Sequence, residues 1–258
     1  MAITLFIEDF PYSKQSQEYF MVIMDLLKFS EKLMLEFNQK NFKDNELAIS
    51  QMLIATYLSK ILKESQAIYL LLTKGFTEDS EKLLRSLVET IINIEYIYND
   101  NASKEEKCTR FILHNPIQRY FLMKGWELGN DKPVHEDVKK EIESGCTSFE
   151  EKYQVKRTTA RDKWAGKNIK EMAEETKMPS GIYRSFYALA SNQIHSSIMS
   201  LNDFTWESEE RSEKSLGGNL GLVGLAIMTV TKRFVNEFNL PYKEIFKQDT
   251  KALGVTSP

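Results

Sequence analysis

The sequence predicts an all-α fold, a single irregular bundle of about seven to nine helices. The chain has 258 residues but only 11 Gly and 6 Pro, whereas an all-β protein needs turn residues about every 8–12 positions. Apolar residues make up 42% of the chain and recur at helical spacing over long stretches, which also excludes intrinsic disorder. Because no Pro-, Ser- or Gly-rich linker divides the sequence, we expect one domain over residues 1–258.

The N-terminal part is expected to form a short arm followed by two helices. The arm covers residues 1–11, and its apolar run ITLFI is also compatible with a short strand. Apolar residues then recur at helical spacing up to about Gln39. A long helix is expected over 46–74, because this stretch contains neither Gly nor Pro. Gly75 follows it in the usual position of a C-terminal cap.

The next long helix is expected over residues 78–98. It begins with Glu78 and Asp79, whose negative charges suit a helix N-terminus. Further on, Pro116 lies inside an apolar stretch, where it either kinks a helix or starts a new one. The remaining chain is expected to contain an irregular polar middle with short helices, a long helix, an acidic loop and a last long helix, over residues 125–180, 181–199, 202–215 and 218–238.

Charge and cysteine usage narrow the class of protein. The formal net charge is −3 and the isoelectric point is about 5.8, so the basic excess of a dedicated nucleic-acid binder is absent. Cys108 and Cys146 form no C-x-x-C pattern, which indicates free thiols in a reducing compartment. The start lacks the basic region of a signal peptide, and the longest apolar run, 220–230, is too short to span a bilayer. We therefore expect a cytoplasmic protein with no membrane partner.

Motif searches favour no metal and no cofactor. The three His and two Cys show no ligand spacing. P-loop, dinucleotide-binding, G-x-S-x-G and H-E-x-x-H motifs are all absent.

The polar side of the expected helix 78–98 is the first candidate site. At about 100° per residue, Arg85, Glu89, Asn93 and Tyr96 fall on one side, away from the Leu/Ile stripe. Arg85 and Glu89 are i,i+4 neighbours and can form an ion pair. Two interpretations remain open, a solvated face with an ordinary surface pair or a second interface facing another helix or a pocket.

The expected helix 181–199 supplies a partner for that side. Ser191 and His195 lie one turn apart with Asn192 in reach, whereas Arg184 is about 16 Å away from His195 along the axis. A histidine flanked by Ser and Asn is either a hydrogen-bonded structural residue or an acid–base group. If the two polar sides face each other, Arg85, Glu89, Ser191 and His195 converge.

Two weaker patterns remain. Gly217, Gly221 and Gly224 share one helix face, which predicts a close helix–helix contact or a homo-oligomer seam. Arg110 and His114 are i,i+4 neighbours near several aromatic residues, and core packing is an alternative explanation of those rings.

Three segments together resemble the bacterial domain-of-unknown-function family 5677. They are LLTKGFTEDSEKLLRSLVETIINIEYI at 71–97, WAGKNIKEMAEE at 164–175 and YRSFYALASNQIHSS at 183–197. The resemblance implies a helical fold and points to Arg85, Glu89, Trp164 and His195, without an established activity. Small helical bacterial proteins are also similar at fold level to the HEPN ribonucleases, which carry an Arg and a His with four to six residues between them, and this sequence departs from that pattern. Here three residues separate Arg110 from His114, and ten separate Arg184 from His195.

Three hypotheses follow for the function. The first is a metal-independent ribonuclease acting in defence or stress, with His195 as general acid/base, Glu89 beside it and Arg85 holding phosphate. The second is a non-catalytic helical module that binds a partner protein or small ligand, with Ser191, Asn192, Trp164, Tyr96 and Arg184 as candidate binding residues. The third is a structural homo-oligomer built on Gly217, Gly221 and Gly224.

Overall fold

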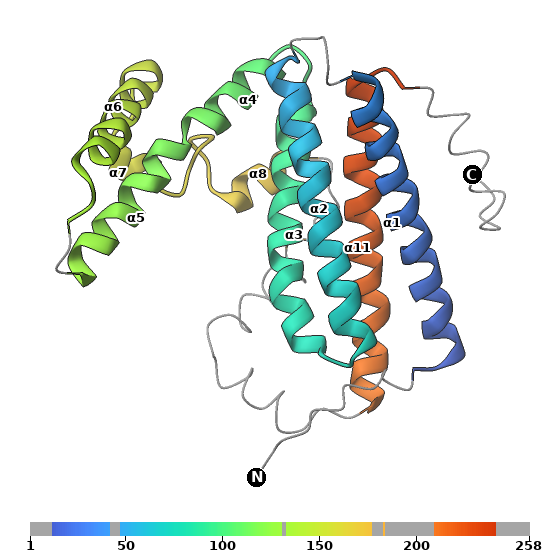
Figure 1. The fold of residues 1–258 in the computed structure, drawn as a ribbon. Helices are drawn as coiled ribbons and strands as arrows, with labels where there is room; N and C mark the ends of the chain where they lie inside the picture. Colours follow the sequence, from blue (N-terminus) through green and yellow to red (C-terminus); the bar gives the residue numbers. More distant parts are fainter. Residues whose placement is uncertain (1–11, 42–46, 131–132, 177–182, 184–208, 241–258) are drawn as a thin grey trace. The chain divides into compact units, whose positions relative to one another are not determined.

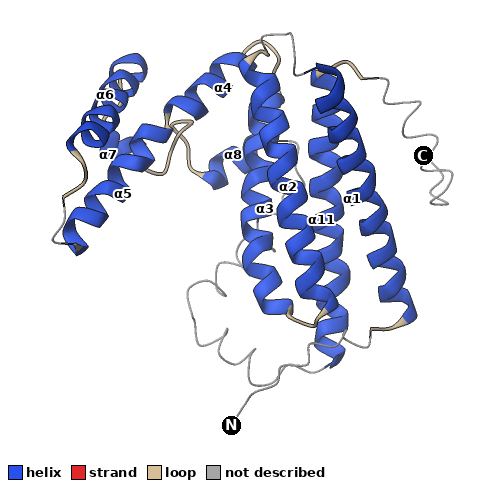
Figure 2. Cartoon of the chain, viewed as in Figure 1, coloured by secondary structure: helices blue, strands red, loops and turns tan. Residues whose placement is uncertain are grey.

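The computed structural model describes residues 12–41, 47–130, 133–176, 183 and 209–240 (Figure 1). Every regular element in this part is a helix (Figure 2), and their number lies within the seven to nine expected. The predicted all-α class is therefore confirmed. None of the described helices combines the length and the apolarity that crossing a bilayer requires.

The chain forms two compact units, Met1–Ile94 with Met178–Pro258 as unit 1, and Glu95–Lys177 as unit 2. The first boundary falls inside a helix rather than in a linker, since α3 runs through it. The single domain expected from the absence of a linker stays a prediction.

Unit 1 is built from four long helices. They are α1 (Lys14–Asn41), α2 (Ile49–Thr73), α3 (Thr77–Tyr98, of which the part up to Ile94 belongs here) and α11 (Glu209–Glu237). The expected helices 46–74 and 78–98 correspond closely to α2 and α3. The expected helix 218–238 begins earlier, because residues 209–215, assigned to the acidic loop, already belong to α11. The expected arm 1–11, the helix 181–199 apart from residue 183, and residues 202–208 lie outside the described residues.

Helix α11 packs against both α1 and α2. Ser30 and Thr231 share a hydrogen bond of 3.0 Å, which joins α1 to α11. Ser50 Oγ donates to Glu237 Oε1 over 2.5 Å, which joins the start of α2 to the end of α11. The core between these buried polar contacts is aliphatic and aromatic, and its fully buried side chains include Ile54, Leu58, Ile61, Ile227, Val230 and Phe234. Burial of these apolar side chains makes the main favourable contribution to the stability of unit 1.

Gly75 ends α2 as predicted. Its φ of 77° is in the left-handed region, which suits a residue without Cβ. Its N–H donates to Leu72 O over 3.0 Å, and the N–H of Phe76 donates to Leu71 O over 2.9 Å. These bonds satisfy carbonyls that the end of the helix would otherwise leave without donors.

Unit 2 is made of shorter helices. They are α4 (Lys104–Leu113), α5 (Asn115–Gly129), α6 (Glu136–Tyr153), α7 (Arg157–Ala160) and α8 (Ile169–Glu175). Pro116 lies in the first turn of α5, so it starts a new helix rather than kinking one. The expected irregular middle, residues 125–180, is more regular than predicted, because α6 is one continuous helix of 18 residues where short helices were expected. One hydrophobic core cluster of unit 2 is formed by Ile117, Met123, Ile142, Cys146, Phe149 and Ala160.

Cys108 and Cys146 are both buried, and neither is part of a disulfide. Burial raises the pKa of the Cys146 thiol, which donates to Pro116 O over 3.3 Å. A buried thiol with a raised pKa is a packing group rather than a nucleophile.

Candidate functional site

The polar side of α3 carries the ion pair that the sequence predicts. Arg85 Nε lies 3.2 Å from Glu89 Oε1, and their side chains are 21% and 40% exposed. Asn93 Nδ2 donates to the carbonyl of Glu89 over 2.9 Å. Arg85 is thus largely covered for an arginine, and the pair is held close to the helix surface.

Helix α2 contributes two residues to this side that the sequence analysis missed. Lys60 Nζ donates to Glu64 Oε1, Ser86 Oγ and Thr90 Oγ1 over 2.7, 3.1 and 2.8 Å. Ser86 Oγ in turn donates to Glu64 Oε1 over 2.8 Å. We call these four side chains the α2–α3 polar cluster. The available signal was the i,i+4 spacing of Lys60 and Glu64 on α2 and of Ser86 and Thr90 on α3.

The α2–α3 polar cluster is nearly closed on itself. The three N–H donors of Lys60 meet three acceptors, so the ammonium is fully used. Glu64 Oε2 is buried without a hydrogen-bond partner, and it is the one atom of the cluster left for an added donor or water. Together with Arg85 and Glu89, the cluster balances two cations against two carboxylates. It therefore offers no net positive charge to a phosphate backbone.

Four of the predicted site residues lie outside the described residues. Arg184, Ser191, Asn192 and His195 all belong to the undescribed range 184–208. The convergence of Arg85, Glu89 and His195 stays a prediction.

Trp164 and Tyr96 meet inside unit 2. Their ring centroids are 5.7 Å apart in an edge-to-face arrangement, and the rings of Phe111 and Trp164 are also edge-to-face, with centroids 5.1 Å apart. The exposed fractions of Trp164 and Tyr96 are 7% and 8%. Arg110 Nε donates to Trp164 O over 2.8 Å and so fixes the backbone beside the ring. These contacts make both rings part of the packing of unit 2, and their binding role stays a prediction.

His114 is also a packing group of unit 2. Its Nε2 lies 2.6 Å from Ala160 O, and its ring packs edge-on against Phe149 at 5.6 Å. Desolvation on burial lowers the pKa of His114 despite the carbonyl that favours its protonated form. Arg110 and His114 therefore serve separate contacts.

The buried His114 makes unit 2 sensitive to acid. Because the folded pKa is below the value in the unfolded chain, the unfolded chain binds more protons as the pH falls through about 6.5, and the stability drops with pH. Replacing His114 by Gln removes this titration while keeping a donor for Ala160 O. We expect the wild type to lose more stability than His114→Gln between about pH 7.5 and pH 5, measured by urea unfolding. His135→Gln, at an exposed histidine, is the control; equal pH slopes in wild type and His114→Gln would contradict the assignment.

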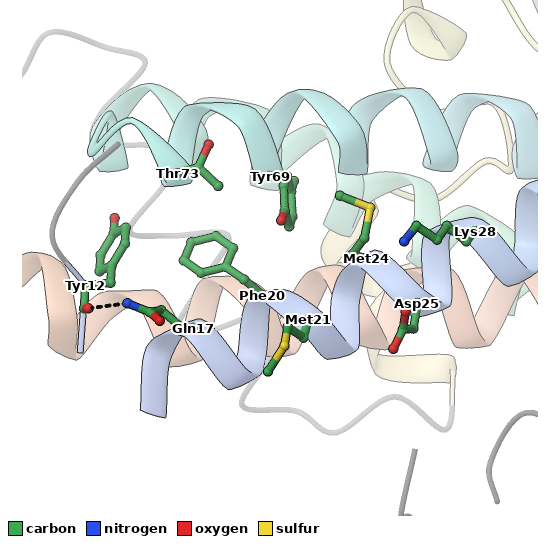
Figure 3. A pocket seen from close by; sticks show the side chains of 9 residues that line it. All are labelled: Tyr12, Gln17, Phe20, Met21, Met24, Asp25, Lys28, Tyr69 and Thr73. Carbon is green, nitrogen blue, oxygen red and sulfur yellow. Dashed lines mark hydrogen bonds between the residues drawn. The ribbon is translucent and has the colours of Figure 1, made fainter. Parts of the chain in front are cut away.

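A groove between α1 and α2 is the second candidate site, in unit 1. It encloses about 530 Å³ and is drawn in Figure 3. Its lining combines three aromatic rings, two methionines and four polar side chains, namely Tyr12, Phe20, Tyr69, Met21, Met24, Gln17, Asp25, Lys28 and Thr73. The volume is within the range of about 300–1,000 Å³ typical of ligand sites.

The two ends of the groove differ. At one end Tyr12 OH donates to Leu72 O over 2.7 Å, and Gln17 Nε2 donates to Tyr12 O over 3.0 Å, so these groups are used in the fold. Phe20 and Tyr69 form an edge-to-face wall, with centroids 5.3 Å apart. At the other end Asp25 and Lys28 are exposed, and neither makes an ion pair or hydrogen bond with the described part of the chain. The groove thus has an ordered apolar wall and a charged end with free binding capacity.

The three glycines of α11 have different surroundings. A Cβ on Gly224 would lie 3.2 Å from Ile23 Cδ1 of α1, so Gly224 serves a close contact within the chain. A Cβ on Gly217 or Gly221 would meet nothing within 4 Å. The expected close helix contact is therefore present at Gly224, and the oligomer seam stays a prediction. In the described part of the chain, no cluster of three or more His, Cys, Asp and Glu could hold a metal ion.

Comparison with known proteins gives one match. No curated protein matches the chain, and no solved structure does. The model of a family of unknown function, DUF5677, matches residues 51–213, which include most of α2, all of α3 to α8 and the ion pair of Arg85 and Glu89. Since this match spans more than half of the chain and agrees with the resemblance of its three segments, the protein belongs to the DUF5677 family.

Proposed function

We propose that the protein is a non-catalytic helical module that binds an amphipathic ligand or partner in the α1–α2 groove. The observation that carries this proposal is the charged end of the groove, where Asp25 and Lys28 stand beside an apolar wall without partners in the described residues. Methionines on such walls adapt to differently shaped apolar groups, and the charged pair orients what binds.

The competing catalytic chemistry has less support among the described residues. His114 is buried with its Nε2 against the carbonyl of Ala160. In the α2–α3 polar cluster the N–H donors of Lys60 all bond to acceptors within the cluster. A binding role asks only for a shaped apolar surface with a few convergent polar groups, which the groove offers.

A fluorescent dye tests the groove directly. The probe is 8-anilinonaphthalene-1-sulfonate, whose aromatic body suits the wall and whose sulfonate suits Lys28. We expect saturable binding to the wild type and at least about tenfold weaker binding to Met21→Glu, because a carboxylate would be placed in the groove beside the sulfonate. Met21 is 60% exposed, so the substitution leaves the core intact.

The matched control is Met228→Glu on α11. Met228 is 45% exposed and does not line the groove. We expect it to bind the dye as the wild type does. Equal dye affinity of Met21→Glu and Met228→Glu, or no saturable binding to the wild type, would overturn the proposal.

A second candidate function is a metal-independent RNA-cleaving effector, acting in the bacterial cytoplasm in defence or stress. The observation that favours it is the adjacent placement of Arg85 and Glu89, a cation for phosphate beside a carboxylate that can orient an imidazole. In this hypothesis His195 is the general acid/base.

Expression in cells tests the second candidate. We expect the wild type to arrest growth and degrade RNA, and His195→Ala to do neither, at equal protein levels. If both proteins are equally harmless and leave RNA intact, the ribonuclease hypothesis is wrong.

A further inference from the structure

A regular stripe of exposed residues runs along α1. Its positions alternate in steps of four and three, and all are exposed: Lys14, Glu18, Met21, Asp25, Lys28, Lys32 and Leu35. This spacing keeps the side chains in line along one face of the helix. In the described structure of unit 1, the stripe faces away from the core residues of α1, such as Ile23 and Leu27.

The charges of this α1 stripe change sign around its centre, between Asp25 and Lys28, whereas Lys14 at its start is basic. Glu18 and Asp25 lie on the N-terminal side, and Lys28 and Lys32 lie on the C-terminal side. Two such stripes running antiparallel about a point between positions 25 and 28 place Asp25 of each copy opposite Lys28 of the other, Met21 opposite Lys32 and Glu18 opposite Leu35. The centre of the pattern lies between positions 25 and 28, so each Asp25 would face the Lys28 of the other copy, twice by symmetry.

We propose that the occupant of the α1–α2 groove is a second copy of this chain, whose α1 lies antiparallel on α1 about a two-fold axis between Asp25 and Lys28. This inference rests on the proposed function and names the partner of the same groove. Met21, Asp25 and Lys28 belong both to the groove lining and to the α1 stripe, so the pairing covers the groove.

The reciprocal contact of Asp25 with Lys28, formed twice about the two-fold axis, is what selects a second copy over an unrelated helix. In the described structure Asp25 and Lys28 make no ion pair, although they are three residues apart on the same helix. In the pair, Met21 lies level with Lys32 of the second copy, where the aliphatic stem of the lysine can cover it. The glycine face of α11 has no comparable pattern, because Gly224 already contacts Ile23 of its own chain.

The size of the contact sets the expected affinity. Helix α1 has 28 residues, which is about 42 Å at 1.5 Å per residue. Stable complexes bury about 1,200–2,000 Å² in total, and one pair of helices with a mostly charged seam is at the low end. We therefore expect a reversible dimer with a dissociation constant on the order of micromolar that weakens with salt.

Charge reversal tests the pairing by sedimentation from about 1 to about 300 µM. Asp25→Lys and Lys28→Asp each place like charges opposite one another, and we expect each to weaken dimerisation at least about tenfold. The double variant Asp25→Lys with Lys28→Asp restores opposite charges only if position 25 faces position 28 of a second copy, and we expect it to dimerise as the wild type does. Lys232→Asp, an exposed charge change on α11, is the control and should leave the dimer intact.

The outcomes separate this inference from the proposed function. A wild type that stays monomeric throughout, single reversals that dimerise normally, or a double variant that does not recover would each overturn the α1 pairing. The dye titration at about 0.1 µM protein, about tenfold below the expected dissociation constant, where the dimer is mostly dissociated, reports on the groove independently. Failure of the dimer with the dye still distinguishing Met21→Glu from Met228→Glu leaves the groove as a ligand site.

Discussion

Replacing Phe234 by alanine is expected to lower the free energy of unfolding of unit 1 by about 3–5 kcal/mol. Phe234 is fully buried on α11, at 0% exposure. Its ring packs edge-to-face on Phe37 of α1, with centroids 5.1 Å apart, and lies 4.8 Å from the ring of Phe238. Truncation removes the apolar contacts and leaves a cavity between helices that cannot close fully.

Urea unfolding followed by far-UV circular dichroism measures this loss. Met228→Ala is the matched control, because Met228 lies on the same helix but is 45% exposed, and we expect a change within about 0.5 kcal/mol. A loss below about 1 kcal/mol for Phe234→Ala would show that α11 does not pack on α1 through this ring.

The positions of the long helices could be predicted because their determinants are local. The stretch 46–74 has no helix breaker, and Gly75 ends it through its own backbone conformation. The result, α2 over Ile49–Thr73, differs from the prediction only at its ends. The effect of Pro116 was harder to predict, because its ring is compatible both with a kink and with the start of a new helix. In the structure α4 ends at Leu113 and α5 begins at Asn115, so Pro116 lies at the start of a new helix.

Two segments show where local reading fails. Residues 209–215 were assigned to a loop because they are charged, yet Glu, Arg and Lys are also good helix formers, and the apolar helix that follows extends back through them. The polar middle, residues 125–180, was expected to contain only short helices. One continuous α6 forms instead, because Gly145 lets α6 lie directly on Pro116 of α5, a contact far apart in sequence.

Of the candidate sites, too, the sequence predicts those that depend on one helix and misses those that depend on the packing of two helices. The pair of Arg85 and Glu89 depends only on the i,i+4 geometry of one helix, so it could be predicted. The contribution of Lys60 and Glu64 depends on the register of α2 against α3, which sequence spacing within either helix does not contain. The α1–α2 groove likewise arises from the packing of two helices, and no motif signals it.

Replacing Gly145 by valine is expected to destabilise unit 2 by about 3 kcal/mol or more. A Cβ built on Gly145 would lie 2.6 Å from Cγ and 2.7 Å from Cβ of Pro116, closer than real Cβ atoms approach. A proline ring cannot rotate away, since it is closed onto its own backbone. Relief therefore requires α5 and α6 to separate, which exposes the core around Ile117 and Cys146.

Gly125→Val on α5 is the control for the same chemical change. A Cβ at Gly125 would meet nothing within 4 Å, and valine is a slightly better helix residue than glycine, so we expect a small gain of a few tenths of a kcal/mol. Urea unfolding followed by tryptophan fluorescence reports on unit 2 through the buried Trp164. A loss of stability at Gly145 with a gain at Gly125 would show that the contact with Pro116 causes the loss, because helix propensity alone predicts a gain at both positions. Equal effects would mean that α6 does not rest on Pro116, and its continuity would then need another cause.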